Sequence, residues 1–548
     1  MTDSRSLVFP KGTQCPIRIL MLADGAIHFG ESDNGFSLSE LITKALLPSA
    51  MPWEDLIITT ARRFDDDDCC ADINDFSFDV NPFGIEQYDQ VWLFGHLGED
   101  EPGTERPKVL RDSELKVLSQ FMNDGGGVFA TGDHANLGFA MCGKVPRVKS
   151  MRKWCFKFCE SPNPPAPGIE DVTRIDTLRE GIDPGFQFND QSDSIPQEIR
   201  PKFYPDPNRK GAYAHPLLVN GDFAITVLPD HLHEGECVVP TNLNEVITYG
   251  DLSFEEYPPL PTPDPQIRLA PQKVAISTSA GGHLVGDFGD IPPVEPRAFD
   301  IIVAYDGQRV MIDGQPIGRV VVDSSFHHFL DINLRGTDSK DPRKRGFYDR
   351  CDNPTKDYEA FKKYYRNIAT WLCPPNRRVI YYHAMLLDLR FRSPLIEELV
   401  PTPKPTYRDY IFTGAVTEKV IAERFSRAEA LQCALAVASR QPDDLRMAFS
   451  SLVDPWLPAE LNVSLTNPLF DSSSLVRLVL GAAMLKIATE LPMDPYKASR
   501  VLNENRPKKA LSEVISQGVS QSFQELYYVL EQLGITANKL QKVLPKTA

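Results

Sequence analysis

Apolar runs that end abruptly in polar residues alternate with amphipathic segments in the first quarter of the chain. Continuous apolar runs at 17–23, 56–61, 90–96 and 128–130 are typical of strands buried on both faces of a parallel sheet. Residues 37–47 and 113–122 lie between these runs and have the apolar spacing of helices. This order predicts an α/β fold with a doubly wound, mostly parallel sheet and right-handed crossovers.

Polar side chains follow these predicted strands at the point where each strand ends. The helix before the fourth strand stops at Asn123-Asp124-Gly125, because glycine accepts the left-handed cap conformation. The strand after it ends in Thr131-Gly132-Asp133-His134. Ligands of open α/β sheets bind outside the carboxyl ends of the strands. We therefore expect ligand contacts there from Asp24, His28, His96 and Gly132.

A late apolar run, 318–323, is followed by two serines and two histidines. Histidine titrates near neutrality and can transfer protons, so the expected catalytic residues are Asp133, His134, His327 and His328. Asp133 and His134 have an alternative role as a hydrogen-bonded pair that stabilises the turn. We expect at least one of the two late histidines to face the site and the other to pack against the sheet. Residues this close in sequence rarely orient as a Ser-His-Asp triad.

The loop 229–236 follows a further predicted strand, 223–228, and is rich in ionisable side chains. His231 and His233 are two residues apart, so in an extended segment they point to the same side. Together with Glu234 they are candidate ligands for a divalent zinc, manganese or iron ion. The alternative is a solvated or structural loop without a metal.

Several of these segments together resemble a known family. The stretches "YDQVWLFG", "LRDSELKVLSQFMNDGGGVFATGDH", "GRVVVDSSFHH" and a closing helix that ends in "IATWL" resemble the ThuA-like branch of the class I glutamine amidotransferase-like superfamily. The resemblance covers about residues 15–375 and implies a flavodoxin-like sandwich, with His134 and His327 or His328 at the family's histidine positions. True glutamine amidotransferases carry a nucleophilic cysteine after this strand. Here Thr131-Gly132-Asp133-His134 stands at that point, so the resemblance implies no glutaminase nucleophile.

The composition changes after a proline-rich segment at 399–409. Residues 1–398 are predicted to form the α/β domain, with insertions around 143–215 and 250–272. The proline-rich segment is predicted to be a stiff linker. Residues 410–548 show only helical spacing and contain no histidine, which predicts an all-α domain without a catalytic centre.

Charge and cysteine content narrow the class of protein. The net charge of -17 argues against a general nucleic-acid or acidic-membrane binder. No apolar run approaches the roughly 20 residues that span a bilayer, so no membrane segment is expected. Ten irregularly spaced cysteines in a chain of 548 residues are typical of reduced thiols, which predicts a cytoplasmic protein.

Two functions from different classes fit these patterns. The first is a hydrolase-like or sugar-acting enzyme that uses a histidine-rich site at the carboxyl edge of the sheet, with or without a divalent metal, on a small-molecule substrate. The second is a non-catalytic α/β scaffold that binds a small ligand or a protein partner. In both, the helical domain is a candidate for assembly into a homo-oligomer or for binding a protein partner.

Overall fold

The computed structural model of the protein describes most of the chain. The described residues are 15–31, 35–47, 54–64, 70–98, 100, 108–133, 137–154, 197–206, 211–221, 223–229, 236–250, 252–261, 266–279, 297–336, 346–399, 404–457, 471–491 and 507–543. Four candidate site residues, His134, His231, His233 and Glu234, lie outside these ranges.

An eight-stranded mixed sheet forms the centre of the N-terminal part, in the order β2-β1-β3-β4-β18-β15-β14-β6. Its strands are β1 (Cys15–Ala23), β2 (Glu54–Arg62), β3 (Gln90–Gly95), β4 (Gly127–Gly132), β6 (Arg200–Pro201), β14 (Gln272–Ser279), β15 (Arg297–Tyr305) and β18 (Val320–Asp323). The first five in spatial order run parallel, and each remaining neighbour pairs antiparallel. The prediction of a large α/β sheet is confirmed.

Shorter strands and helices lie outside this sheet. Paired strands outside it are β5 (Gln197–Glu198), β7 (Phe203–Pro205), β8 (Ala212–Ala214), β9 (Val219–Asn220), β10 (Phe223–Ala224), β11 (Val227–Leu228), β12 (Val246–Tyr249), β13 (Leu252–Glu255), β16 (Met311–Ile312) and β17 (Gln315–Pro316). Helices and turns of this part are η1 (Leu41–Leu46), α1 (Asp112–Asn123), α2 (Phe139–Cys142), η2 (Pro216–Leu218), η3 (Gly307–Arg309), η4 (Phe326–His328), α3 (Asp331–Leu334) and α4 (Lys356–Trp371).

The expectation of one strand at 223–228 was wrong. Residues 223–224 and 227–228 form β10 and β11, which pair antiparallel with β9 and β5 and lie outside the main sheet. The segment is not buried on both faces as a strand of the main sheet would be. Phe223 is 80% exposed, whereas Leu228 is fully buried. The loop 229–236 therefore does not leave the main sheet directly.

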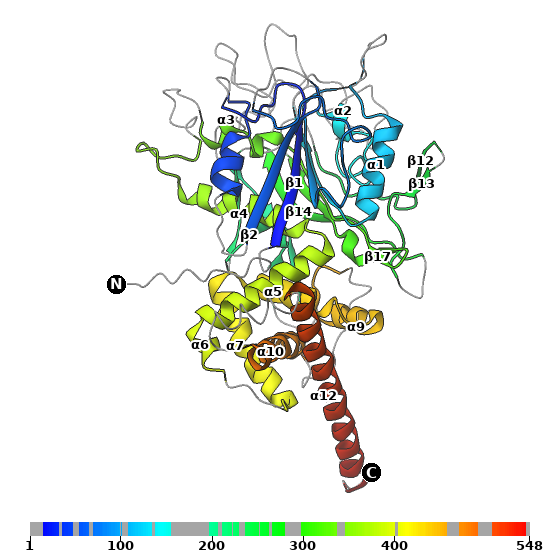
Figure 1. Ribbon diagram of the computed structural model, residues 1–548, viewed down its shortest axis with the longest axis vertical. Helices are drawn as coiled ribbons and strands as arrows, with labels where there is room; N and C mark the ends of the chain where they lie inside the picture. Colours follow the sequence, from blue (N-terminus) through cyan, green and yellow to red (C-terminus); the bar gives the residue numbers. More distant parts are fainter. Residues whose placement is uncertain are drawn as a thin grey trace.

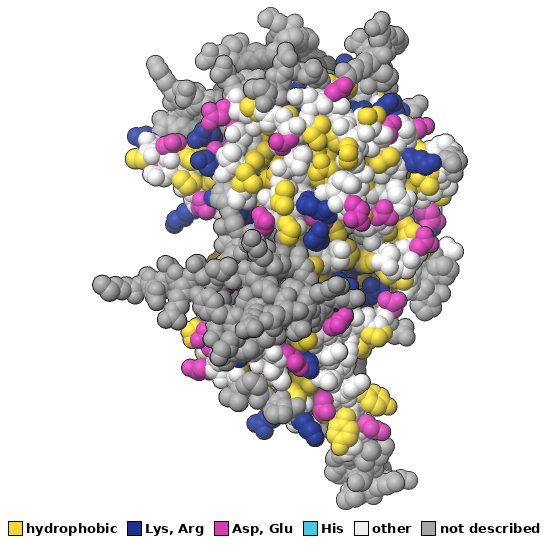
Figure 2. All heavy atoms as spheres, in the orientation of Figure 1, with side chains coloured by type: hydrophobic (Ala, Val, Ile, Leu, Met, Phe, Trp, Pro, Cys, Tyr) yellow, Lys and Arg dark blue, Asp and Glu magenta, His cyan; other side chains and the backbone are white. Residues whose placement is uncertain are grey.

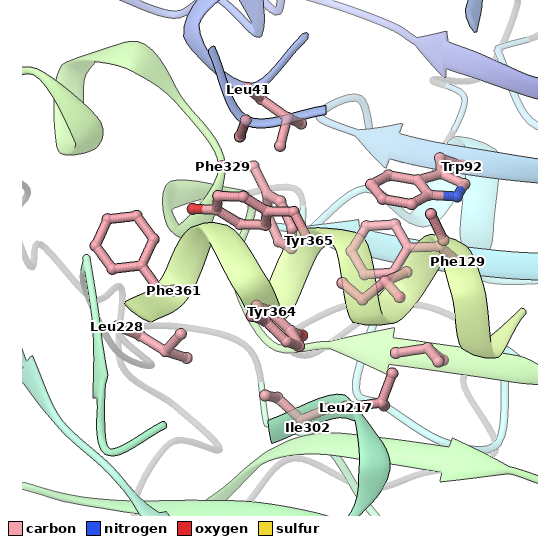
Figure 3. Packing of buried hydrophobic residues seen from close by; sticks show 14 of the residues in the cluster. Leu41, Trp92, Phe129, Leu217, Leu228, Ile302, Phe329, Phe361, Tyr364 and Tyr365 are labelled. Atoms are coloured by element: carbon pink, nitrogen blue, oxygen red, sulfur yellow. The ribbon is translucent and has the colours of Figure 1, made fainter. Parts of the chain in front are cut away.

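Helices cover both faces of the sheet, as Figure 1 shows. On one face α4 and η1 pack over the apolar side chains of the strands. Figure 3 shows Phe361, Tyr364 and Tyr365 of α4 in the same apolar layer as Phe329, Phe129 and Trp92. On the other face α1 and α2 bury a second apolar cluster. The helix α1 ends as predicted, with Gly125 at φ +97°, a conformation that favours glycine.

The C-terminal part is helical. Its helices are α5 (Pro375–Arg392), α6 (Pro394–Glu397), α7 (Tyr407–Arg424), α8 (Arg427–Ala438), α9 (Asp443–Val453), α10 (Ser472–Glu490) and α12 (Pro507–Val543). They share one core, to which α5 contributes although it precedes the proline-rich segment. In Figure 1 this helical part lies at the end of the sheet opposite α2 and α3.

One described helix, α10, is long and apolar enough to cross a membrane, with a mean hydropathy of 1.3. This corrects the expectation that no apolar run reaches that length. In the protein 78% of the apolar window is buried, chiefly against α7 and α12, as in the core helix of a soluble protein.

Candidate functional site

The carboxyl ends of four adjacent strands meet at one edge of the sheet. Ala23 of β1 pairs with Phe94 of β3, and Gly95 of β3 pairs with Gly132 of β4. β18 lies on the other side of β4. Asp24, His96, Asp133 and the segment after Asp323 therefore follow neighbouring strands at the same edge, as the sequence predicted.

Asp24 is fully buried and holds the turn that follows β3. Its Oδ1 accepts hydrogen bonds from the backbone N–H groups of His96 at 2.6 Å and Leu97 at 3.1 Å. Its Oδ2 has no hydrogen-bond partner among the described residues. Burial raises the pKa of Asp24 to about 6, although both backbone N–H groups act to lower it. This carboxyl group therefore titrates close to neutral pH.

His96 is half-buried between Gly25 and Phe326. Its ring stacks on that of Phe326, with centroids 6.1 Å apart. A Cβ on Gly25 would lie 2.5 Å from the imidazole Nδ1, so only glycine leaves room for the ring. Burial lowers the pKa of His96, and the nearby His327 lowers it further, while Asp133 acts in the opposite direction. Burial and His327 therefore both favour the neutral imidazole.

The two late histidines point to different surroundings. Nδ1 of His327 lies 2.8 Å from Oδ1 of Asn333, and its ring meets Phe36 edge-on. His327 is close enough to His96 to affect its pKa. His328 is fully buried and its Nδ1 lies 2.6 Å from Oδ1 of Asp323. Together these contacts put His327 beside His96 and give His328 a partner in the core.

The serines between these residues do not complete a triad among the described residues. Ser325 caps η4 by accepting a hydrogen bond from the backbone N–H of His327 at 3.1 Å. The Oγ of Ser324 is buried without a hydrogen-bond partner in the described part of the chain. Asp323 instead accepts a hydrogen bond from the hydroxyl of Tyr364 at 2.6 Å.

The space beside Gly132 is filled by the chain itself. A Cβ there would lie 2.4 Å from the carbonyl oxygen of Leu137 and 2.9 Å from that of Gly95. Close backbone packing thus explains this glycine, and its contact with a ligand stays a prediction. His28 lies on the loop after β1, where its backbone N–H donates to the carbonyl of Phe36 at 2.9 Å.

Three arginines at this edge were missed by the sequence analysis. Arg62 and Arg63 directly follow the second predicted strand, 56–61, so the rule that selected Asp24 applies to them as well. Arg62 donates to the carbonyl of Gly25 at 2.7 Å, and Arg63 pairs with Glu114. No sequence pattern marks the third, Arg152, which is fully buried.

The guanidinium of Arg152 joins the ends of two strands. It donates to the carbonyl oxygens of Gly132 at the end of β4 and of Ser324 just past β18. It also donates to Leu137 at 3.0 Å and Lys153 at 2.9 Å. Its ring partner is Trp154, with the guanidinium carbon 4.4 Å from the ring centroid. This contact network fixes the edge of the sheet on which Asp133 stands.

Cys142 of α2 follows β4 in the chain, after the point at which true glutamine amidotransferases carry their nucleophilic cysteine. It is fully buried, and its Sγ lies 4.0 Å from the carbonyl oxygen of Thr131. Burial raises the pKa of Cys142 well above the ordinary thiol value, so the thiol stays protonated at neutral pH. In the part of the chain that the structure describes, no group of three or more His, Cys, Asp or Glu side chains is arranged to hold a metal ion.

Comparison with known proteins adds no family to this geometry. Neither the protein-family models nor the curated proteins contain a match to this chain.

Proposed function

We propose that this protein is a cytoplasmic, hydrolase-like or sugar-acting enzyme whose site lies at the carboxyl edge of the sheet. The observation that supports it is the neighbourhood of His96, His327, Asp133 and Asp24 at the ends of parallel strands. We further propose that the sheet belongs to the flavodoxin-like arrangement of ThuA-like proteins.

The chemistry assigned to this site is proton transfer. A histidine that is neutral at pH 7 accepts a proton from water or from a substrate hydroxyl, and His96 meets that requirement. A carboxyl group with a pKa of about 6 is partly protonated near neutral pH, which suits Asp24 for adjusting the charge beside it. In this proposal Asp133 and His327 position and orient the substrate, and His134 takes part beside Asp133.

A divalent metal belongs to this proposal through His231, His233 and Glu234. Imidazole and carboxylate ligands suit zinc, manganese or iron, and such an ion would supply an activated water. These three residues lie outside the described ranges, so the proposal gives them no geometry.

Turnover assays with matched variants test the enzymatic proposal. Purified protein is assayed on chromogenic esters, glycosides and phosphate esters, with and without added Zn²⁺, Mn²⁺ or Fe²⁺. His96→Gln and His327→Gln are expected to reduce turnover by about 100-fold or more. Asp357→Asn, an exposed position on α4, serves as a control that should leave turnover unchanged. Equal turnover by wild type and His96→Gln would contradict the role of this site.

The second candidate function, a scaffold that assembles through the helical part, is favoured by a feature of α12. This helix extends away from the rest of the protein in Figure 1 and exposes Tyr527 by 70% and Tyr528 by 56%. Leu530 is also 43% exposed. We propose that a second copy of the chain covers these side chains. Light scattering should then show that the wild type is a dimer and that the Tyr527→Ser, Leu530→Ser double variant is a monomer. A monomeric wild type would contradict assembly through these side chains.

A further inference from the structure

A large cavity lies at the other end of the sheet from the proposed catalytic site. It has a volume of about 830 Å³ and is lined by residues just before β4 and β18, by β17, and by the first turn of α5. Residues of α8 and α9 form the opposite wall. The cavity is therefore built by both parts of the chain, and its volume is within the usual range for small-molecule sites.

Two carboxylates in this region form ion pairs with two arginines. Asp306 accepts hydrogen bonds from Arg319 at 2.6 and 3.1 Å and from Arg309 at 2.9 Å. Arg309 also forms an ion pair with the buried Asp454 of the helical part. The charges of these four side chains are thus balanced within the protein.

Arg378, in the first turn of α5, is not balanced in this way. Its Nε and Nη1 atoms are buried and have no hydrogen-bond partner among the described residues. Burial lowers the pKa of Arg378 to about 9, and the neighbouring Arg319 contributes in the same direction. A buried cationic donor without a partner is costly, so an anion in the cavity would relieve it.

A second cation faces the cavity from the opposite wall. Arg446 of α9 pairs at 3.0 Å with Asp443, which is 78% exposed, and its buried Nε has no hydrogen-bond partner in the described part of the chain. The first turn of α5, from Pro375 to Val379, also lines the cavity, and the amino end of a helix favours negative charge. Figure 2 shows basic side chains at the waist between the two parts of the molecule.

The remainder of the lining is mixed: polar side chains, among them Asp124, Asp313 and Asp443, alternate with an apolar set. The apolar set includes Leu252, Leu260, Ile312, Val379, Leu435, Met447 and Leu457. A ligand that fills this space therefore needs an apolar body as well as a charged end.

We infer that this cavity binds a small organic anion, with a phosphate or carboxylate group at Arg378 and Arg446 and an apolar body against the surrounding leucines. This inference goes beyond the proposed enzymatic function, because the cavity adjoins the amino ends of β4 and β18 and the catalytic proposal concerns their carboxyl ends. A bound anion would contact α5 and α9 of the helical part and β17 of the α/β part at the same time.

Calorimetric titration of the full-length protein at low salt tests the inference. The probes are inorganic phosphate, phenyl phosphate, benzoate and the neutral benzyl alcohol. We expect phenyl phosphate or benzoate to bind with 1:1 stoichiometry and benzyl alcohol not to bind. The tighter of the two anions identifies the head group. Binding of neither anion would overturn the inference.

Variants separate recognition from folding. Arg378→Gln should weaken binding of the anion at least about tenfold, whereas Arg408→Gln, an exposed arginine outside the cavity lining, should leave it unchanged. Because the buried Nε and Nη1 of Arg378 have no hydrogen-bond partner among the described residues, ligand-free Arg378→Gln should melt at the wild-type temperature or above. Undiminished binding by Arg378→Gln, or a lower melting temperature of its ligand-free form, would instead contradict the assignment.

Discussion

Nδ1 of His328 lies 2.6 Å from Oδ1 of Asp323 in the core between β18 and α4. Both side chains are inaccessible to solvent. The second carboxylate oxygen accepts the hydroxyl hydrogen of Tyr364 at 2.6 Å. The strand that carries the candidate site is thereby attached to the helix beneath it by polar contacts within an apolar layer.

Removing the Tyr364 hydroxyl should destabilise the protein more than removing that of Tyr365. Tyr364 donates to a buried carboxylate, whereas Tyr365 donates to the backbone carbonyl of His328. We expect Tyr364→Phe to lower the free energy of unfolding by about 2–3 kcal/mol and Tyr365→Phe by about 1 kcal/mol. Urea denaturation of both variants measures this. Equal losses would show that the charge of Asp323 has no special role.

Asp24→Asn should stabilise the protein at pH 8 and reduce the proposed activity. The pKa of Asp24 is raised by burial to about 6, above the value of 3.8 for a free side chain. Its contribution to stability is full below pH 3.8 and is lost as the pH rises through 6. An asparagine still accepts the two backbone hydrogen bonds and carries no charge, so we expect a gain of about 2–3 kcal/mol at pH 8.

Thermal denaturation of the Asp24→Asn variant between pH 4 and pH 8 measures this gain. Asp306→Asn is the matched control, and we expect it to lower stability at pH 8. Arg319 and Arg309 overcome the effect of burial and lower the pKa of Asp306, so its charged form stabilises the fold. A loss of stability by Asp24→Asn at pH 8 would contradict the assigned cause.

Glu114→Gln should remove a large part of the acid sensitivity of the protein. Burial acts to raise the pKa of Glu114, but two hydrogen bonds from Arg63, at 2.6 and 2.9 Å, bring it down to about 2. Because the folded-state pKa is depressed, the stabilisation is present above pH 4.5 and is lost as the pH falls toward 2.

We expect Glu114→Gln to lose about 2–3 kcal/mol at pH 7 and much less at pH 3, measured by urea denaturation at both values. The control is Glu359→Gln, which breaks an exposed pair with Lys362 and should change stability by less than about 0.5 kcal/mol at either pH. The same loss for Glu114→Gln at pH 3 and pH 7 would reject the ion pair as the cause.

Gly481→Ala should destabilise the helical part although alanine is the better helix former. A Cβ at Gly481 of α10 would lie 1.9 Å from the carbonyl oxygen of Tyr410 in α7. The higher helix propensity of alanine usually stabilises a helix by about 1 kcal/mol relative to glycine. Here overpacking against Tyr410 outweighs that gain, so we expect the free energy of unfolding to fall by about 2 kcal/mol or more. Gly518→Ala, where the nearest atom is a side-chain carbon at 2.9 Å, should lose less. Circular dichroism melts compare the two, and a stabilised Gly481→Ala would show that α7 and α10 are farther apart.

The sequence predicted the parallel core of the sheet because each buried strand is a continuous apolar run. The closing helix predicted to end in "IATWL" is α4, whose last residue is Trp371. The direction of β15 was not predictable in the same way, since an apolar run reads alike whether the strand is parallel or antiparallel. The helix α5 was not predicted because every residue from Tyr381 to Arg390 is buried, which leaves no one-sided apolar stripe in the sequence.

The candidate site was predictable where a residue directly follows a strand. Asp24, His96 and Asp133 are of this kind, and so are Arg62 and Arg63, which the same rule would have identified. Arg152 could not be predicted from the sequence. Its guanidinium binds backbone carbonyl oxygens, which every residue type has, so no sequence pattern marks its partners. The cavity around Arg378 could not be predicted from the sequence either, because its walls come from segments more than 300 residues apart.

Arg152 has a consequence for how this protein tolerates change. Its guanidinium ties the ends of β4 and β18 through main-chain oxygens, so the attachment is indifferent to which side chains stand at those positions. A change of side chain at either strand end therefore leaves the attachment in place. A change in the backbone path at Leu137 does not, because its carbonyl also accepts a hydrogen bond from Arg152.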